Sequence, residues 1–241
     1  MAPKASSSKQ AAQQSSRCAC SAGSCGGWLK IFAVLLGVLA PIFYILDQNV
    51  SRFFIFEVDH LAEVAKRNVE TYGNDTRAMV NAIVAELQGK AELSTYINRD
   101  EEWMFNNAGG AMGAMYIIHA SFTEYLIIFG TAVGTEGHTG RHTADDYFHI
   151  LTGVQEAYVP GEYEPEVYPP GSVHHLRRGT VKQYKMPGSC FALEYARGWI
   201  PPMLFFGYAD GLSSTLDLPT LWRTTWVTGK LMLGNLARGK F

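Results

Sequence analysis

The most apolar stretch of the chain covers residues 28–46 and holds one charged residue, Lys30, close to its start. As an α-helix this stretch would be about 28 Å long at about 1.5 Å per residue, which matches the roughly 30 Å hydrocarbon core of a bilayer. Trp28 and Tyr44 lie near its two ends, where aromatic side chains gather at membrane interfaces. A cleaved secretory signal is the alternative, but no small-residue cleavage site follows Leu46. The pattern therefore predicts an uncleaved transmembrane anchor.

The segments on either side of this anchor differ in charge. Residues 1–27 are rich in Ser, Ala, Gln and Gly, contain basic but no acidic residues, and are expected to be disordered. Acidic residues follow the anchor, at Asp47, Glu57 and Asp59. Because segments with an excess of Lys and Arg stay on the cytosolic side, the sequence predicts a cytosolic amino terminus and a lumenal body. A glycosylation sequon that starts at Asn74 would report this orientation.

The cysteines are concentrated in the tail. Three of the four, Cys18, Cys20 and Cys25, precede the anchor, and their spacing lacks the fourth ligand of a zinc site. Acylation beside the anchor and unreactive thiols are the two alternatives for these residues. Cys190 stands alone in the body, so no disulfide is expected there.

Two segments after the anchor have apolar residues at helical spacing. They are residues 53–70 and residues 75–88, the second with Met79, Ile83 and Leu87. Apolar side chains three or four positions apart share one face of a helix. We therefore expect residues 47–108 to contain amphipathic helices that pack on the body.

The apolar segment 109–134 has two interpretations. Its composition resembles a second transmembrane helix, but His119, Ser121, Thr123 and Glu124 lie near its centre. A central acid costs about 2.5–3.5 kcal/mol on insertion into a bilayer. The segment is therefore predicted to be buried core, with His119 and Glu124 hydrogen-bonded, because an unpaired buried charge is too costly.

From about residue 125 to residue 209 the pattern changes to short alternating runs broken by Gly and Pro. This is typical of many short strands, as in a β-barrel or jelly roll. The sequence predicts an α+β protein with a β-barrel body over residues 109–212. Residues 213–241 return to a helical pattern that is basic and contains Trp222 and Trp226. Such helices suit a membrane surface, and docking on the barrel is the alternative.

Composition narrows the class of function. Charged residues make up only 17% of the chain, against about 25% in typical soluble domains, so part of the surface is not expected to face water. A net charge of −2 argues against nucleic-acid binding. The chain has no P-loop, dinucleotide-binding or nucleophile-elbow motif, so nucleotide binding and α/β-hydrolase chemistry are not supported.

The seven histidines raise the question of a metal. His138 and His142 are four residues apart but lack the glutamate of the zinc-protease motif and flank Gly140. His174 and His175 resemble half of a metal-binding cupin motif, but the second half is missing. We therefore predict no metal and no cofactor, with a metal-dependent cupin oxygenase as a rival class.

Two carboxylate positions are the strongest chemical candidates. Strand alternation places Glu194 among small apolar residues, on the face opposite Phe191 and Tyr195, where burial should raise its pKa. If Asp145 or Asp146 reaches Glu194, the pair would share a proton and divide acid and base roles. The alternative is a pair of structural carboxylates.

Six ordered blocks resemble the fungal sterol Δ8–Δ7 isomerases and the related sigma receptors of animals. They cover residues 107–115, 119–132, 137–141, 166–171, 193–201 and 214–217. The segment around Asp145 is similar to the isomerase branch, because the receptor branch has its pocket aspartate where this chain has Phe148. The resemblance thus places the second acid at Asp145.

The resemblance implies a cupin-like β-barrel without metal, flanked by helices, with one amino-terminal anchor and carboxyl-terminal helices on the membrane. It also implies a homotrimer in the endoplasmic reticulum membrane, in contact with its lipids. Fungal members move the ring double bond of fecosterol to give episterol in ergosterol synthesis, by protonation and deprotonation through a carbocation. Cationic amphiphilic amines would inhibit by mimicking this cation. The alternative function is a sigma receptor-like protein that binds amines without catalysis.

The resemblance also implies roles for individual residues. Asp145 and Glu194 would be the catalytic acid and base, and Tyr125 would be the pocket tyrosine that hydrogen-bonds the glutamate. Aromatic faces stabilise a nearby cation, so further aromatic residues are candidate walls of the substrate site. They are Phe105, Tyr147, Phe148, Phe191 and Trp199.

Overall fold

The computed structural model describes residues 22–241 and divides into two units, the first of which ends at Gln48. The tail was expected to be disordered over residues 1–27. Its residues 1–21, with Cys18 and Cys20 and their expected acylation, lie outside the described residues, whereas residues 22–27 are helical. The first unit is helix α1 (Ala22–Gln48), which begins ahead of Trp28, where the sequence placed the start of the anchor. Residues Lys30–Gln48 of α1 have a mean hydropathy of 2.0 and are long and apolar enough to cross a membrane.

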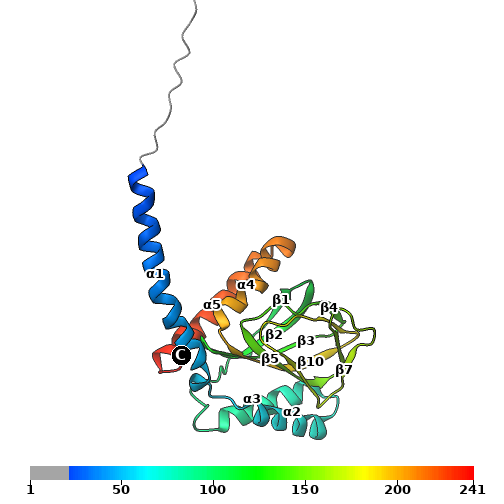
Figure 1. The fold of residues 1–241 in the computed structure, drawn as a ribbon. Helices are drawn as coiled ribbons and strands as arrows, with labels where there is room; N and C mark the ends of the chain where they lie inside the picture. The colour runs from blue at the N-terminus through cyan, green and yellow to red at the C-terminus, as the bar shows by residue number, and fades with distance from the viewer. Residues whose placement is uncertain (1–21) are drawn as a thin grey trace, which may run out of the picture. The chain divides into compact units, whose positions relative to one another are not determined.

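The body, Asn49–Phe241, is built on two antiparallel sheets (Figure 1). The larger sheet has the strand order β1-β2-β3-β10-β5-β8, and the smaller sheet has the order β4-β9-β6-β7. The strands are β1 (Trp103–Ala108), β2 (Ala111–Ala120), β3 (Glu124–Thr131), β4 (Thr135–His138), β5 (Ala144–Thr152), β6 (Gln155–Tyr158), β7 (Glu166–Tyr168), β8 (Val173–Leu176), β9 (Gln183–Met186) and β10 (Cys190–Gly198). With the flanking helices, these sheets confirm the predicted α+β class.

The ambiguous segment 109–134 forms the buried strands β2 and β3, which confirms its interpretation as core. All of β3 is buried, as expected for a central strand with both faces covered. The turn between the strands is held by Ser121, whose Oγ accepts the backbone N–H groups of Thr123 and Glu124. The polar residues that argue against a membrane helix therefore make the corner of a hairpin.

Helices α2 (Val58–Tyr72) and α3 (Thr76–Gly89) cover one face of the larger sheet, as predicted (Figure 1). The Asp75 side chain accepts the N–H of Ala78 at 3.0 Å and so begins α3 with an N-cap. Leu61, Met79 and Ile83 are fully buried against this face, in one apolar cluster with Leu193 and Tyr195 of β10. Strand alternation therefore directs the odd-numbered residues of β10 toward the helices.

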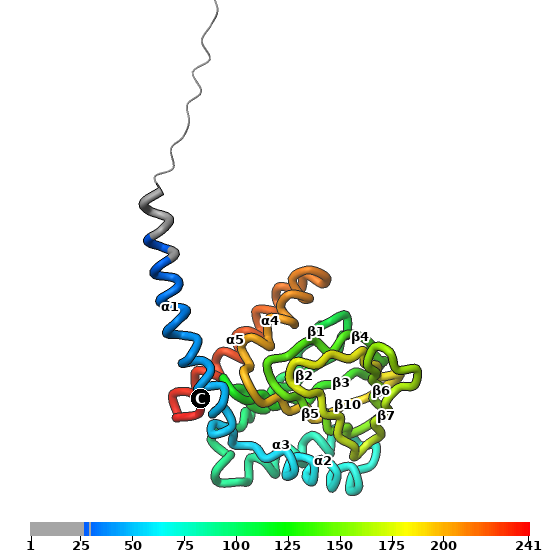
Figure 2. Tube along the Cα trace, viewed as in Figure 1, coloured from blue at the N-terminus to red at the C-terminus, as the bar shows by residue number. Residues whose placement is uncertain are grey.

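Two further helices, α4 (Ile200–Asp210) and α5 (Leu218–Ala237), pack on the strands at the start of the sheet (Figure 2). A π-helical turn, η2 (Gly211–Thr215), joins them, and a 3₁₀ turn, η1 (Val50–Phe53), lies at the start of the body. Residues 200–210, which the sequence pattern predicted to be part of the barrel, form α4 instead. Pro201 and Pro202 occupy its first turn, where a missing N–H costs nothing.

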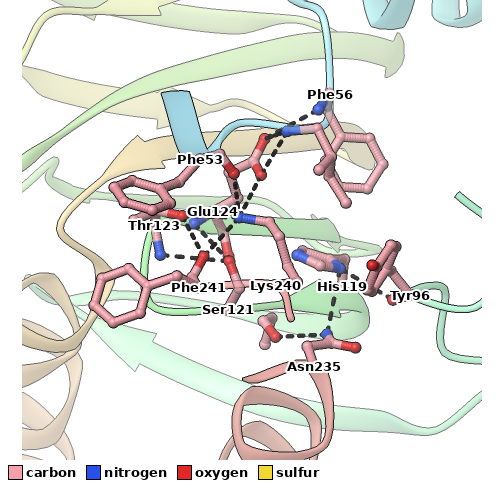
Figure 3. Close-up of polar contacts among 12 residues, drawn as sticks. Phe53, Phe56, Tyr96, His119, Ser121, Thr123, Glu124, Asn235, Lys240 and Phe241 are labelled. Carbon is pink, nitrogen blue, oxygen red and sulfur yellow. Dashed lines mark hydrogen bonds and ion pairs between the residues drawn. The ribbon is translucent and has the colours of Figure 1, made fainter. Parts of the chain in front are cut away.

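The carboxyl terminus returns to the core of the body and meets the buried side chain of Glu124 (Figure 3). Glu124 accepts the N–H groups of Ile55 and Phe56 and the hydroxyl of Tyr195, and it pairs with Lys240 at 2.8 Å. His119, also predicted to be a satisfied interior group, hydrogen-bonds the carbonyl of Tyr96 through Nδ1 at 3.0 Å. Glu124 is therefore a structural acid with all its partners in place, as the sequence indicated.

Candidate active site

A largely apolar cavity opens between the two sheets and is closed on one side by α4 and α5. Its wall comes from β1, β2, β3, β4, β5, β9 and β10, from both helices and from the turn η2 between them. The lining includes the carboxyl groups of Asp146 and Glu194 together with Phe105, Met115, Tyr125, Ile127, Phe129, Phe148, Tyr184, Met203, Leu204 and Phe206. Such an apolar pocket with a few convergent polar groups is the usual form of a small-molecule site.

Asp146 and Glu194 meet because their strands are neighbours. In the β5–β10 ladder, Asp146 pairs with Ala196 and Glu194 pairs with Phe148. The two acids are therefore diagonal neighbours on the same face of the sheet, close enough for their side chains to touch. Their carboxyl groups share a hydrogen bond, and Asp146 is only 1% exposed. The accessible part of Glu194 faces the cavity that it lines.

Burial shifts both groups toward the protonated form. Desolvation raises the pKa of Asp146 to about 7, although its hydrogen bond with Glu194 lowers it. The pKa of Glu194 is raised well above its usual value, by desolvation first and then by the charge of Asp146. The pair therefore holds one shared proton at neutral pH, because two adjacent carboxylates cannot both ionise in an apolar site.

Asp145, which the sequence analysis chose as the second acid, lies on the other face of β5. Its carboxylate contacts His175 at 3.1 Å and accepts the N–H of Arg178 at 3.0 Å. Asp145 faces Arg197 across the ladder, whereas Asp146 faces Ala196. Successive residues of a strand point to opposite faces, so only one of two adjacent aspartates can enter the cavity. The structure therefore brings Asp146, and not the predicted Asp145, to the side of Glu194.

The aromatic candidates divide into two groups of three. Phe105, Tyr125 and Phe148 line the cavity. The Tyr125 hydroxyl lies 3.5 Å from Thr228 Oγ1, so its hydrogen bond differs from the one with the glutamate that the resemblance implied.

The other three aromatic candidates lie away from the cavity lining. Tyr147 stacks on His175 with 4.2 Å between ring centroids, Phe191 packs edge-on against Trp103, and Trp199 packs edge-on against Phe241. Tyr147 and Phe191 lie on the face of the larger sheet that α2 and α3 cover. This follows from strand alternation, because Asp146 and Glu194 point to the opposite face. The structure therefore places these three predicted wall residues in packing contacts outside the cavity lining.

The histidines lie in several different environments. His174 is fully buried, hydrogen-bonds Gln155 Oε1 at 2.7 Å through Nδ1, and stacks on Tyr168. Desolvation lowers its pKa to about 4, which keeps the ring neutral. His138 and His142 line the cavity. Within residues 22–241, no group of three or more His, Cys, Asp and Glu side chains is arranged to hold a metal ion.

Two parts of the site were not found from the sequence. Met203, Leu204 and Phe206 come from α4, which the strand-like punctuation of the region concealed. Tyr184 comes from β9, and the alternation of β9 gives a signal for it, since Tyr184 and Met186 are its two buried residues. An inward-facing position in a short alternating strand thus marks a lining residue even without a motif.

The chemistry available here is proton transfer without water. One carboxyl group of the pair can give a proton to a bound apolar molecule while its ionised neighbour accepts one. The apolar walls exclude solvent, which strengthens every charge interaction inside. The aromatic residues of the wall can face a developing cation.

Comparison with known proteins gives a consistent result. The profile of the family described as ERG2 and Sigma1 receptor like protein matches residues 33–240. A C-8 sterol isomerase of Neurospora crassa is 72% identical over 90% of this chain and 85% of its own length, and one of Aspergillus fumigatus is 61% identical over the whole of both chains. The sigma non-opioid intracellular receptor 1 of Xenopus tropicalis is 38% identical over 76% of this chain and 81% of its own.

Among solved structures, an RmlC-like cupin from Shewanella frigidimarina is similar over 44% of this chain and 90% of its own, with 12% identity and a TM-score of 0.36.

Proposed function

The chain belongs to the ERG2 and Sigma1 receptor like family, and we propose that it is a C-8 sterol isomerase that uses the Asp146–Glu194 pair to move a ring double bond from Δ8 to Δ7. The observation that carries the residue assignment is the hydrogen-bonded pair of buried acids in the wall of an apolar cavity. A sterol nucleus is a large apolar body, which suits such walls.

The isomerase is favoured over a receptor that binds amines without catalysis. The C-8 sterol isomerases named above are 61–72% identical to this chain, whereas the sigma receptor is 38% identical. The chemistry agrees, because a receptor for amines needs one carboxylate, while moving a double bond needs both a proton donor and a proton acceptor. Asp146 and Glu194 supply both in one hydrogen-bonded unit.

The reaction is balanced within the pair. The protonated carboxyl group gives its proton to C9 of the Δ8 sterol, and the electron pair of the double bond forms the new C–H bond. A cation is left at C8. The other carboxylate removes a proton from C7, and the electrons of that C–H bond form the Δ7 double bond. One carboxyl group loses a proton and the other gains one, so the pair again holds a single proton after the reaction. Transfer of that proton across their hydrogen bond restores the starting state.

The site lowers the barrier mainly by placement and by charge. An alkene is a very weak base, so the acid must lie close to C9, in the right orientation and away from water. The cation at C8 is stabilised by the negative charge that the pair acquires as it gives up its proton. The aromatic rings of Tyr125 and Phe148 add a smaller attraction to the same cation.

The proposal extends to the setting of the enzyme. Helices α4 and α5 would rest on the endoplasmic reticulum membrane, which exposed apolar side chains support: Phe205 is 74% exposed, Trp222 69% and Trp226 62%. Tryptophan is favoured at the membrane interface, and a sterol could enter the cavity from the bilayer past these helices. The body would be lumenal and the assembly trimeric. Lipophilic amines, protonated at neutral pH, would inhibit as mimics of the cation.

The test is sterol conversion by the full-length protein in heavy water. An isomerase that follows this mechanism places one deuterium at C9 of the Δ7 product. The Asp146→Asn and Glu194→Gln variants should each lose at least 100-fold in kcat, as is usual for an acid or base. Asp145→Asn is the matched control, one residue away on the other face of β5, and should keep near-normal turnover. Equal losses for Asp145→Asn and Asp146→Asn would overturn the assignment.

A further inference from the structure

Tyr184 occupies a special position in the cavity, on the sheet that faces the acid pair. It lies on β9, between Gly137 of β4 and Ala157 of β6 in the small sheet, whereas Asp146 and Glu194 lie on the large sheet. It is 9% exposed, and it lines the same cavity as both acids. Tyr184 therefore lines the cavity from the small sheet, and the pair lines it from the large sheet.

The Tyr184 hydroxyl is an unused donor on a side chain that lines the same cavity as both carboxyl groups. It makes no hydrogen bond within residues 22–241, and the groups whose charges act on it are Glu194 and Asp146. Desolvation, followed by these two acids, raises its pKa, so it stays a protonated phenol. On the other side, Oδ1 of Asp146 is buried without a hydrogen-bond partner in this part of the chain. The side chains that carry this unused donor and this unused acceptor thus line the same cavity.

The pair needs such a donor at one moment of the reaction. Before reaction, one proton is shared by the two carboxyl groups. Once that proton has moved to the sterol, both are ionised and repel each other. The lining of the cavity, as far as the structure describes it, contains no Lys or Arg to offset this charge. The other titratable side chains of the lining are Tyr125, His138, His142, Tyr208 and Asp217.

The hydroxyl groups of the other two lining tyrosines already have contacts. The Tyr125 hydroxyl lies beside Thr228, and the Tyr208 hydroxyl lies 2.6 Å from Thr225 Oγ1. Both His138 and His142 sit at the end of the small sheet near Phe206 of α4, and burial lowers the pKa of His142, which keeps it neutral. Tyr184 is therefore the donor best placed to serve the ionised pair.

We propose that Tyr184 is a positioning residue for the reaction, whose hydroxyl donates a hydrogen bond to the Asp146–Glu194 pair when the pair has given its proton to the sterol. The inference rests on the proposed function, since it assumes that this pair is the acid and base. A bond that forms in the ionised state lowers the barrier without tightening the binding of the substrate.

The test compares Tyr184→Phe with Tyr158→Phe in the full-length protein. Phenylalanine keeps the ring and removes only the hydroxyl. Tyr158 is the matched control, because it lies in the neighbouring strand β6, opposite Gln183, on the exposed face of the small sheet. We expect kcat of Tyr184→Phe to fall about 10- to 100-fold, as for a lost hydrogen bond to a charged group, with KM unchanged. Tyr158→Phe should match the wild type.

The pH profile gives a readout that a structural role would not move. Turnover requires a pair with one proton, so activity falls on the alkaline side when the second proton leaves. A hydrogen bond to the ionised pair favours loss of that proton, and its removal moves the alkaline limb of Tyr184→Phe to higher pH. Binding of a long-chain tertiary amine, measured by titration, should be retained and shows that the cavity is intact.

The outcomes separate the two ideas. Unchanged kcat in Tyr184→Phe, with Asp146→Asn inactive, overturns the role of Tyr184 and leaves the proposed function standing. A rise in KM at unchanged kcat also overturns it, because the residue then only binds the sterol. Near-normal turnover of Asp146→Asn itself overturns the proposed function instead.

Discussion

Lys240, next to the carboxyl terminus, forms a buried ion pair with Glu124, with 2.8 Å between Nζ and Oε2. The same ammonium group donates to the carbonyl of Phe53 and to Thr123 Oγ1 (Figure 3). Glu124 in turn accepts the N–H groups of Ile55 and Phe56. One ion pair therefore ties together the end of the chain, the corner of the β2–β3 hairpin and the first residues of the body.

Removing the lysine should strongly destabilise the body. In Lys240→Met the charge of Glu124 stays buried without its cation, which typically costs about 3–5 kcal/mol. The backbone donors and Tyr195 still satisfy part of the carboxylate, so we expect a loss near 3 kcal/mol. Denaturant unfolding of the detergent-solubilised protein would measure this loss.

Lys230→Met is the control, since that lysine is exposed and lies 3.9 Å from Asp100, and it should change the stability by less than about 0.5 kcal/mol. Similar losses for both variants would contradict the special role of Lys240.

The shifted pKa values of the acid pair predict a pH dependence of stability. An aspartate has a pKa of about 3.8 in the unfolded chain, and burial raises that of Asp146 to about 7. Between these values the folded protein holds more protons than the unfolded chain, so its stability falls as the pH rises through this range. Asp146→Asn removes this contribution. The variant should therefore melt at a higher temperature than the wild type at pH 8, and this gain should shrink toward pH 4.

Thermal unfolding at the two pH values checks this expectation, with Asp145→Asn as the control. The Asp145 carboxylate accepts hydrogen bonds at the outer face, so its loss should give no gain at pH 8. A gain for Asp146→Asn of the same size at both pH values would show that the carboxyl group is not the cause.

The two faces of the larger sheet predict different effects of aromatic substitutions in β5 and β10. Phe148 lines the cavity opposite Glu194 in the ladder, and Phe191 packs on Trp103 outside it. Phe148→Leu should raise KM for the sterol about tenfold, because contact with an apolar substrate worth about 1.4 kcal/mol is lost. Phe191→Leu should leave KM unchanged. Steady-state kinetics on the two purified variants decide this, and a larger effect on KM in Phe191→Leu would contradict the placement of the cavity.

Much of this fold could be predicted from the sequence, because the spacing of apolar residues in these segments matches the pattern of burial in the structure. The period of 3.6 in residues 53–88 predicts α2 and α3, and the acid inside the apolar segment 109–134 excludes a second membrane helix. The inward direction of Glu194 follows from alternation with small neighbours in β10. Each of these is a local pattern, which a single sequence displays.

What the sequence did not predict depends on the register between strands. Asp145 and Asp146 are chemically identical, and only the pairing of Ala196 with Asp146 determines which enters the cavity. Alternation from Glu194 already excluded Phe191 from the cavity, since residues an odd number apart point to opposite faces. Lys240 meets Glu124 through long-range packing of the carboxyl terminus, for which no local pattern exists.

The orientation across the membrane can be tested with the sequon at Asn74. This residue is exposed at the turn between α2 and α3, and Thr76 completes the Asn-x-Thr sequence. If the body is lumenal, Asn74 meets the glycosylation machinery, and the protein from endoplasmic reticulum membranes should shift to lower mass after endoglycosidase treatment. Asn74→Gln should abolish the shift.

A second acceptor position is useful because the acidic residue Asp75, in the middle of the first sequon, slows modification. Val133→Asn supplies the acceptor sequence Asn-Gly-Thr at a position that is 90% exposed. A protein that stays unmodified at both positions would place the body in the cytosol, contrary to the excess of basic residues before the anchor.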